Sequence, residues 1–373
     1  MTHADAPLVG ARSWFEVASR YLGAADAIAA LVYPLALTAL YDGGQMLRAA
    51  GSWETRLSAW SVTLGAAVLV YSVPVASFWI IYRLGQLQQP CRAQLRARAS
   101  AHLAFASPPL FTAIGVLFYL LHSSSDYLVW SALWLAILFA TLFARHDMPA
   151  AAARKESRAA EWVRSAHGVS ALTMLLVFLG PHIANHLTAI WSADLHKAVM
   201  NGLRVVYRST LTQPALVGLV SFQLVTGGAL LRTRLVGKTD FFGSLQTASG
   251  AYLGIFVISH LTAVFILGRQ AMQVDTNWDF AIGAPAGLVG DPWNVRLVPH
   301  YSLAVLLLFT HLACGLRNVL LGRRIAVTTA TRTAAAVIVF GGAVAFTVTL
   351  AMLGVHFKAH EVPDAIARTI PNP

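Results

Sequence analysis

Nine long apolar stretches, separated by charged or turn-forming segments, follow one another along this chain of 373 residues. A bilayer core about 30 Å thick takes roughly 20 apolar residues of α-helix. The pattern therefore predicts an all-α, polytopic membrane protein of about nine transmembrane helices. The stretches lie at about 24–41, 58–82, 101–122, 126–144, 163–191, 213–231, 246–268, 298–321 and 333–356.

Two of the segments between these stretches are long enough to hold structure of their own. In residues 192–212, apolar side chains recur every three or four positions, which predicts an amphipathic helix lying in the membrane interface. Residues 270–299 combine Gly, Pro and Asp with Trp278 and Trp293. That mixture indicates an ordered cap over the bundle rather than a solvated linker.

The composition favours the same class of protein. Of all residues, 57% are apolar and only 12% are charged, and the mean hydropathy is +0.62. Such a chain cannot present the charged surface of an ordinary soluble globule. We therefore expect a lipid bilayer around it.

The formal net charge of +11 is explained by the loops. If the spans alternate in direction, 18 of the 27 Lys and Arg residues fall on the side of the N-terminus. Basic residues collect in cytoplasmic loops, so we expect a cytoplasmic N-terminus and a periplasmic C-terminus in a bacterial inner membrane. No nucleic-acid partner is needed to explain the charge.

A charged, Ala-rich segment at 146–162 divides the chain into two parts. Residues 1–145 hold four of the predicted spans, and nothing in their sequence indicates a role. Residues 163–373 hold the other five. We expect 146–162 to be a cytoplasmic linker between a four-helix region and a five-helix domain.

Histidines concentrate in the spans of the five-helix part. His167, His182 and His186 lie on its first span, His260 on its third and His311 on its fourth. Ionisable side chains inside a membrane are costly and are functional candidates by default. A lone buried histidine is nonetheless more often a hydrogen-bonded packing residue than a ligand, so their depth matters.

At about 1.5 Å per residue, His182 and His260 reach similar depths in the outer half of the bilayer, and His311 lies in the inner half. Paired imidazoles from facing helices suit an iron held axially inside a porphyrin. Zinc is less suited, because it takes three or four converging ligands, often with carboxylate or thiolate, and the spans from 163 to 321 contain no Asp or Glu.

Two segments carry a family resemblance. Residues 245–261 contain Gln246, Ser249 and Gly250, followed ten residues later by His260. This run resembles the first helix of the di-haem cytochrome b subunit of fumarate reductases and succinate dehydrogenases. Residues 311–321 are similar to the second signature of that superfamily, in which a haem-ligand histidine precedes an arginine by six residues. The resemblance gives these places to His311 and Arg317.

Residues 167–182 look like a diverged copy of the first pattern, with Ser170 in the small-residue position and His182 one residue further along. In the family the outer haem is shared by the two helices of this kind, which implies haem b between His182 and His260. The position of the partner expected for His311 holds Gln223. A second haem there is left open: His311 could pair with His167 after a shift, bind an open-sited haem, or bind none.

Other candidate residues have two interpretations each. Ser170, Ser249 and Gly250 would let a flat macrocycle approach the backbone, or would serve close helix packing. Arg269, just before the 270–299 segment, and Arg296, near its end, would pair with haem propionates or would be ordinary boundary arginines.

The leading hypothesis is an integral membrane b-type cytochrome that transfers electrons within or across the bilayer, to or from quinone. The chain has two cysteines and no Gly-x-Gly-x-x-Gly fingerprint, so flavin and iron–sulfur groups would belong to separate redox subunits. We expect no catalytic residues and no self-contained enzyme. A weaker resemblance to a fungal mitochondrial membrane-protein family of lipid homeostasis keeps a non-enzymatic scaffold as the alternative, with a transporter as the third.

Overall fold

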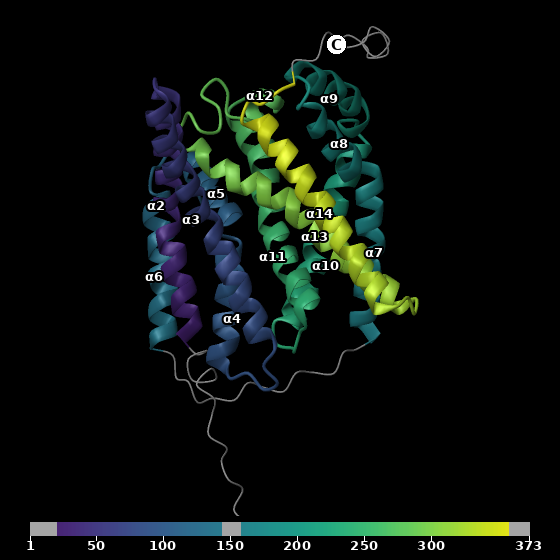
Figure 1. The fold of residues 1–373 in the computed structure, drawn as a ribbon. Coiled ribbons are helices and arrows are strands. Elements are labelled where there is room, and N and C mark those ends of the chain that lie inside the picture. Colours follow the sequence, from purple (N-terminus) through teal and green to yellow (C-terminus); the bar gives the residue numbers. More distant parts are fainter. Residues whose placement is uncertain (1–20, 144–157, 358–373) are drawn as a thin grey trace, which may run out of the picture.

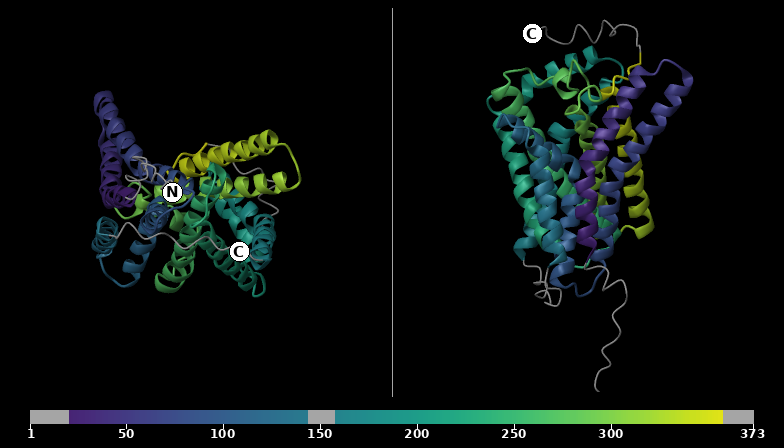
Figure 2. Two further views of the ribbon diagram at one scale, coloured as in Figure 1. Left: turned by 90° about the horizontal axis from the view of Figure 1, so that it is seen from below. Right: turned by 90° about the vertical axis from the view of Figure 1, so that its left-hand side faces the viewer.

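The computed structural model describes residues 21–143 and 158–357 (Figure 1). Within these ranges the regular structure is helical and contains no strand, as the apolar pattern predicts. The helices run up and down through a single bundle (Figures 1 and 2). Their bounds are α2 Leu22–Ala49, α3 Trp53–Gly85, α4 Arg92–Phe105, α5 Ser107–Leu120, α6 Asp126–Leu142, α7 Arg158–Met174, η2 Leu175–Leu179, α8 Gly180–Thr188, α9 Ala193–Tyr207, α10 Thr212–Arg234, α11 Phe241–Leu261, η3 Thr262–Ala271, α12 Trp278–Ala281, η4 Asn294–Arg296, α13 Leu297–Gly322 and α14 Val327–Met352.

In the part of the chain that the structure describes, seven helical segments are long and apolar enough to cross a membrane. An eighth crossing is made if α4 and α5 count as one span, although they are bent by 69°. The helix α6 is apolar but has only 17 residues. The architecture is thus the expected polytopic α-helical one, with the third and fourth predicted spans less regular than the others.

The third predicted span, 101–122, is wrong as a single helix. The chain instead breaks at Ala106, between α4 and α5. Pro108 and Pro109 occupy the first turn of α5, where their missing N–H groups cost nothing, but they could not continue α4. α4 also begins earlier than predicted, at Arg92, because its first turns pack inside the protein and do not face lipid.

Both predicted ordered connections are confirmed. The amphipathic helix expected in 192–212 is α9, and Ser192 caps it by accepting a hydrogen bond from the N–H of Leu195 at 3.0 Å. The segment 270–299 contains α12 and η4, and the Trp278 side chain within it is 1% exposed. We call the end of the bundle that carries α9 and α12 the α9 end; it is uppermost in Figure 1.

The two parts of the chain share a buried core. One buried cluster joins Ile81 and Phe105 of the first part to Ala248, Tyr252 and Leu307 of the second. The predicted linker lies mostly outside the described residues, and its last positions, from 158 onward, form the start of α7. The boundary between the two parts is visible in the sequence, whereas the described helices of both parts pack against each other.

The pair α7 and α10 is the least covered part of the bundle. Only 6% of the apolar window in each of these spans is buried inside the protein, compared with 50% for α2. α7 packs on α10, and α10 in turn contacts α11. α7 and α10 are therefore covered by few neighbouring elements.

Candidate functional site

The first histidine pair joins α7 to α13, at the level of the first turns of α11. The ring centres of His167 and His311 lie 6.4 Å apart. A metal–imidazole bond is about 2 Å long and the ring centre lies about 1 Å beyond the nitrogen, so two axial imidazoles on one metal have centres about 6 Å apart. The ring centres of this pair are thus separated by about the distance that two imidazoles would have on one metal ion, so His167 and His311 are the residues that would hold a haem iron here.

Hydrogen bonds fix the protonation of both rings in this pair. Nδ1 of His311 lies 3.0 Å from the carbonyl oxygen of Gln246, which can only accept, so this nitrogen donates. Nδ1 of His167 lies 2.8 Å from the hydroxyl of Thr226, whose own hydrogen is donated to the carbonyl of Phe222. His167 must therefore also donate from Nδ1. Both Nε2 atoms are left with a free lone pair, which is the state in which histidine binds metals.

Small residues let these rings approach the helices. A Cβ at Gly250 would lie 2.9 Å from Cε1 of His311, and a Cβ at Gly227 would lie 3.3 Å from Cε1 of His167. The hydroxyl of Ser249 is 3.2 Å from Nδ1 of His311. The small residues on α11 thus make room for His311 of α13. This use agrees with close helix packing, one of their two predicted interpretations.

The second pair lies toward the α9 end and joins α8 to α11. The ring centres of His182 and His260 are also 6.4 Å apart, and each ring is stacked on a phenylalanine, Phe178 and Phe256 respectively. Nε2 of His182 lies 3.3 Å from Nε2 of His186. Ligation through that nitrogen requires this contact to be released, so the second pair is less prepared for a metal than the first.

A π-helical segment explains how His182 reaches His260. His182 follows Ala171 by eleven residues, whereas His260 follows Gly250 by ten. The five residues Leu175–Leu179 form a π-helix, whose wider turn takes up one residue more than an α-helical turn. The extra residue is absorbed before Pro181, and the imidazole faces the interior.

The two pairs lie at different depths. His311 contacts α11 at Gly250, and His260 is ten residues further along the same helix. At 1.5 Å per residue these levels are about 15 Å apart. The bundle therefore contains two two-histidine sites, one above the other along the direction of the spans.

The remaining candidate residues lie around these sites and contact other residues of the protein. Gln223, at the position expected to pair with His311, donates from Nε2 to the carbonyl of His167 and to the hydroxyl of Ser170. It links α10 to α7 and supplies no ligand. The Gln246 side chain accepts from Asn318 at 3.0 Å.

The three candidate arginines occupy different places. The Arg269 guanidinium lies over the Phe265 ring and donates to Gln213 at 3.3 Å, in the π-helix that follows His260. Arg317 lies over Phe242.

Arg296 is not placed as a propionate partner. Its guanidinium forms an ion pair of 2.9 Å with Asp126, whose side chain is nearly buried at the start of α6. Arg296 therefore pairs with a carboxylate from the first half of the chain.

The sequence reasoning missed the part that α9 plays. His196 is buried on the inner face of α9, with Nε2 3.2 Å from Nδ1 of His186 and 3.2 Å from the side-chain nitrogen of Asn185. Burial lowers the pKa of His196 to about 4. Neither the amphipathic pattern nor the spacing from His186 gives a signal that distinguishes this histidine from a surface one.

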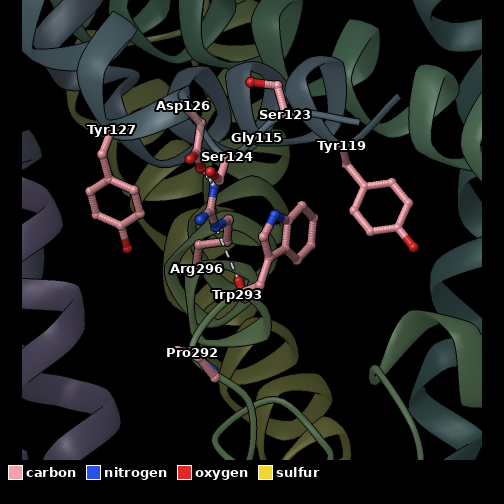
Figure 3. A pocket seen from close by; sticks show the side chains of 9 residues that line it. All are labelled: Gly115, Tyr119, Ser123, Ser124, Asp126, Tyr127, Pro292, Trp293 and Arg296. Carbon is pink, nitrogen blue, oxygen red and sulfur yellow. Dashed lines mark hydrogen bonds and ion pairs between the residues drawn. The ribbon is translucent and has the colours of Figure 1, made fainter. Parts of the chain in front are cut away.

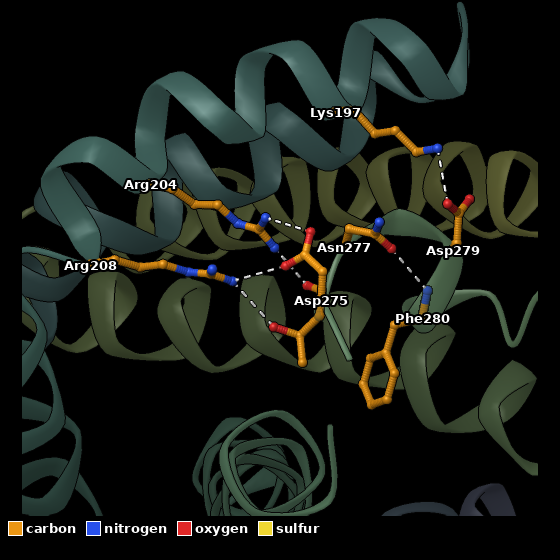
Figure 4. Close-up of polar contacts among 8 residues, drawn as sticks. Lys197, Arg204, Arg208, Asp275, Asn277, Asp279 and Phe280 are labelled. Atoms are coloured by element: carbon orange, nitrogen blue, oxygen red, sulfur yellow. Dashed lines mark hydrogen bonds and ion pairs between the residues drawn. The ribbon is translucent and has the colours of Figure 1, made fainter. Parts of the chain in front are cut away.

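Ion pairs hold α9 against the connection that follows α11 (Figure 4). Lys197 contacts Asp279 at 2.9 Å, and Arg204 and Arg208 contact Asp275 at 3.0 and 3.5 Å. Desolvation acts to raise the pKa of Asp275, but the hydrogen bonds and charges of the two arginines lower it overall. α9 and the cap thus close the end of the bundle above the second pair.

Among the described residues, no three or more His, Cys, Asp or Glu side chains come together in a way that could hold a metal ion. The arrangement present is two pairs of imidazoles, each pair contributed by two different helices with ring centres 6.4 Å apart. No family model, curated protein or solved structure matches the chain.

Proposed function

We propose that the chain is an integral membrane b-type cytochrome, similar to the di-haem cytochrome b subunits, that transfers electrons within or across the bilayer. The observation that carries the proposal is the His167–His311 pair, in which both Nδ1 atoms donate hydrogen bonds and both Nε2 atoms keep a free lone pair. The His182–His260 pair, at the same ring spacing, is the second site.

Bound haem supplies a reversible one-electron couple at its iron. The residues of the chain hold, orient and insulate it. The acceptors of the two Nδ1 hydrogens, Thr226 and the Gln246 carbonyl, keep each ring turned toward the interior and increase the basicity of the opposite nitrogen. The apolar helices exclude water, which sets a low dielectric around the site.

Two sites about 15 Å apart along the spans suit passage of electrons from one side of the bilayer to the other. We place the N-terminus in the cytoplasm and the C-terminus in the periplasm of a bacterial inner membrane, on the distribution of Lys and Arg. The proposal includes electron exchange with quinone or with separate redox subunits. Any flavin would belong to such a subunit, since the sequence contains no dinucleotide fingerprint.

The test is a reduced-minus-oxidised visible spectrum of the purified protein, with a pyridine-haemochrome assay of haem per chain. We expect two low-spin b-type haems. His311→Ala and His260→Ala should each remove one, and His186→Ala should keep both because the proposal assigns it no ligand role. His122→Asn, at an exposed left-handed position that Asn tolerates, is the matched surface control.

Loss of one haem in His260→Ala and none in His311→Ala would restrict the function to the outer site. A full haem complement in both variants would contradict the pairing. A protein without haem, after expression with adequate haem supply, would overturn the cytochrome and favour a membrane scaffold.

A further inference from the structure

A pocket of about 400 Å³ opens at the α9 end, between the turn that joins α5 to α6 and the residues just before α13 (Figure 3). None of the candidate histidines lines it. Its walls come from both parts of the chain, including Ser123 and Asp126 from the first and Trp293 and Arg296 from the second. A ligand in this pocket would contact residues 1–145, to which the cytochrome proposal assigns no function.

A buried ion pair forms the inner wall of the pocket. Nη1 of Arg296 donates to Asp126 at 2.9 Å, and the side chains are only 3% and 9% exposed. The guanidinium lies between the rings of Phe111 and Trp293, at 4.4 and 4.7 Å from their centres. Burying two charges is costly even when they are paired. The pair leaves the wall with no net charge but with a strong local dipole.

Aromatic rings and hydroxyl groups complete the lining. Tyr119, Tyr127 and Trp293 supply aromatic rings, and Ser124 supplies a hydroxyl at the α5–α6 turn. The hydroxyl of Ser123 also lies in the lining, but it donates to Ser125 at 3.0 Å. In Figure 3 the Trp293 ring lies beside Arg296, with the two tyrosines on opposite sides of the opening. Ring faces attract cations, including quaternary ammonium groups, and hydroxyls and a guanidinium donate hydrogen bonds to phosphate.

The rim of the pocket continues into apolar surface. Leu121 and Leu128, on either side of the α5–α6 turn, are 61% and 70% exposed. Aromatic residues at the end of a transmembrane bundle mark the headgroup level of the bilayer. A ligand in this pocket can therefore keep an apolar tail against α5 and α6.

We propose that the pocket binds the zwitterionic headgroup of a phospholipid, phosphatidylethanolamine or phosphatidylcholine, from the leaflet at the α9 end. The ammonium group contacts the Asp126 carboxylate and the tyrosine rings. The phosphate accepts from Arg296 and from the hydroxyl of Ser124. An anionic headgroup fits worse, because it would bring a net negative charge against Asp126 in a wall that is already neutral.

The test uses the purified full chain in detergent and follows its thermal unfolding. Dihexanoyl phosphatidylethanolamine should raise the midpoint in a saturable way, as any ligand of the folded state does. Dihexanoyl phosphatidylglycerol should need at least about a tenfold higher concentration for the same shift, a difference of about 1.4 kcal/mol. Equal responses to the two lipids would overturn the proposal. So would an equal response to phosphocholine alone, which would identify a soluble ligand in place of a lipid.

Charge variants make the test specific to this pocket. Asp126→Asn leaves Arg296 as the only charge in the wall, so the preference should reverse toward phosphatidylglycerol. Asp279→Asn removes an acidic charge at the same end, from the contact with Lys197, and should leave the preference unchanged. If Asp126→Asn does not fold, the double variant Asp126→Asn/Arg296→Gln removes both charges and should abolish the preference. An unchanged preference in the charge variants would overturn the proposal.

Discussion

The imidazole of His311 occupies the space that a side chain at Gly250 would need. A Cβ at that position would lie 2.9 Å from Cε1 of the ring, closer than real Cβ contacts allow. The same ring is held by a hydrogen bond to the carbonyl of Gln246, one turn earlier on α11. The position of His311 is therefore set by the backbone of α11 and depends on glycine at 250.

Gly250→Ala should displace His311 and weaken its site. A methyl group forced into a filled place typically costs about 1–3 kcal/mol, so we expect the haem content of the His167–His311 site to fall several-fold. The haem of the His182–His260 site should remain. The measurement is haem per chain together with the reduced-minus-oxidised spectrum.

Gly254→Ala is the matched control, because no atom of the described residues lies within 4 Å of a Cβ there. It lies on the same helix, one turn further along, and should keep both haems. Equal haem loss in the two variants would mean that glycine flexibility in α11, and not the room for His311, determines binding.

Thr226→Val tests the hydrogen bond that orients His167. Valine has nearly the shape of threonine but cannot accept from Nδ1, which lies 2.8 Å from the hydroxyl. Loss of such a partner typically weakens metal binding about 10–100-fold, so haem should dissociate more readily from this site and its midpoint potential should shift. Titration with haem and a potentiometric titration measure both effects.

Thr233→Val controls for the change of side chain, since Thr233 is exposed and donates only to the carbonyl of Leu230. An unchanged haem affinity and potential in Thr226→Val would show that this hydrogen bond does not prepare His167 for a metal.

The π-helix over Leu175–Leu179 leads to a prediction about chain length. Deleting Val177, which is 49% exposed, removes the extra residue and lets α7 continue as an α-helix to Pro181 with His182 still facing His260. We expect the outer haem to persist. Insertion of one alanine after Val177 should rotate His182 about the helix axis by about 100° and abolish binding of the outer haem. If the deletion removes the haem as completely as the insertion does, the π-turn is not what places His182.

Much of the fold follows from the sequence because the bilayer sets the length and polarity of each span. The amphipathic stretch 192–212 identifies α9, and the two tryptophans of 270–299 identify the cap. The break at Ala106 was missed because the stretch 101–122 is apolar on both sides of Pro108 and Pro109 and was counted as one span. The two prolines mark the break in the sequence, and the packing of the basic helix α4 inside the protein completes it. Hydropathy alone cannot distinguish a helix that faces lipid from one that faces other helices.

The candidate site could be predicted where the position of a histidine along its span sets its depth in the bilayer. His182 and His260 were expected at one level, and the structure brings them together. The pairing of His167 with His311 was one of three alternatives, since it depends on the crossing of α7 and α13, which no local pattern encodes. The partner of Arg296 could not be predicted for the same reason: Asp126 is 170 positions away in the sequence.

The burial of His196 predicts how α9 responds to pH. Its pKa is lowered to about 4 by burial, with further lowering by His182, Arg204 and Lys197, whereas an unfolded histidine has a pKa of about 6.5. Because the folded pKa is the lower one, the unfolded state binds the proton first. This contribution to stability is complete above about pH 6.5 and is lost as the pH falls toward 4, by a few kcal/mol at most.

We therefore expect α9 to open as the pH is lowered from 7 to 5. The measurement is the protection factor, the intrinsic exchange rate at each pH divided by the observed rate, which should fall over Ala193–Tyr207 while α13 stays protected. His196→Gln does not titrate in this range and should remove the pH dependence, whatever its effect on the rate at pH 7. The ion pair of Asp275 should not account for the change, because the pKa of this carboxyl is lowered and it stays ionised at pH 5. Exchange over α9 that accelerates equally in wild type and His196→Gln would contradict a role for His196.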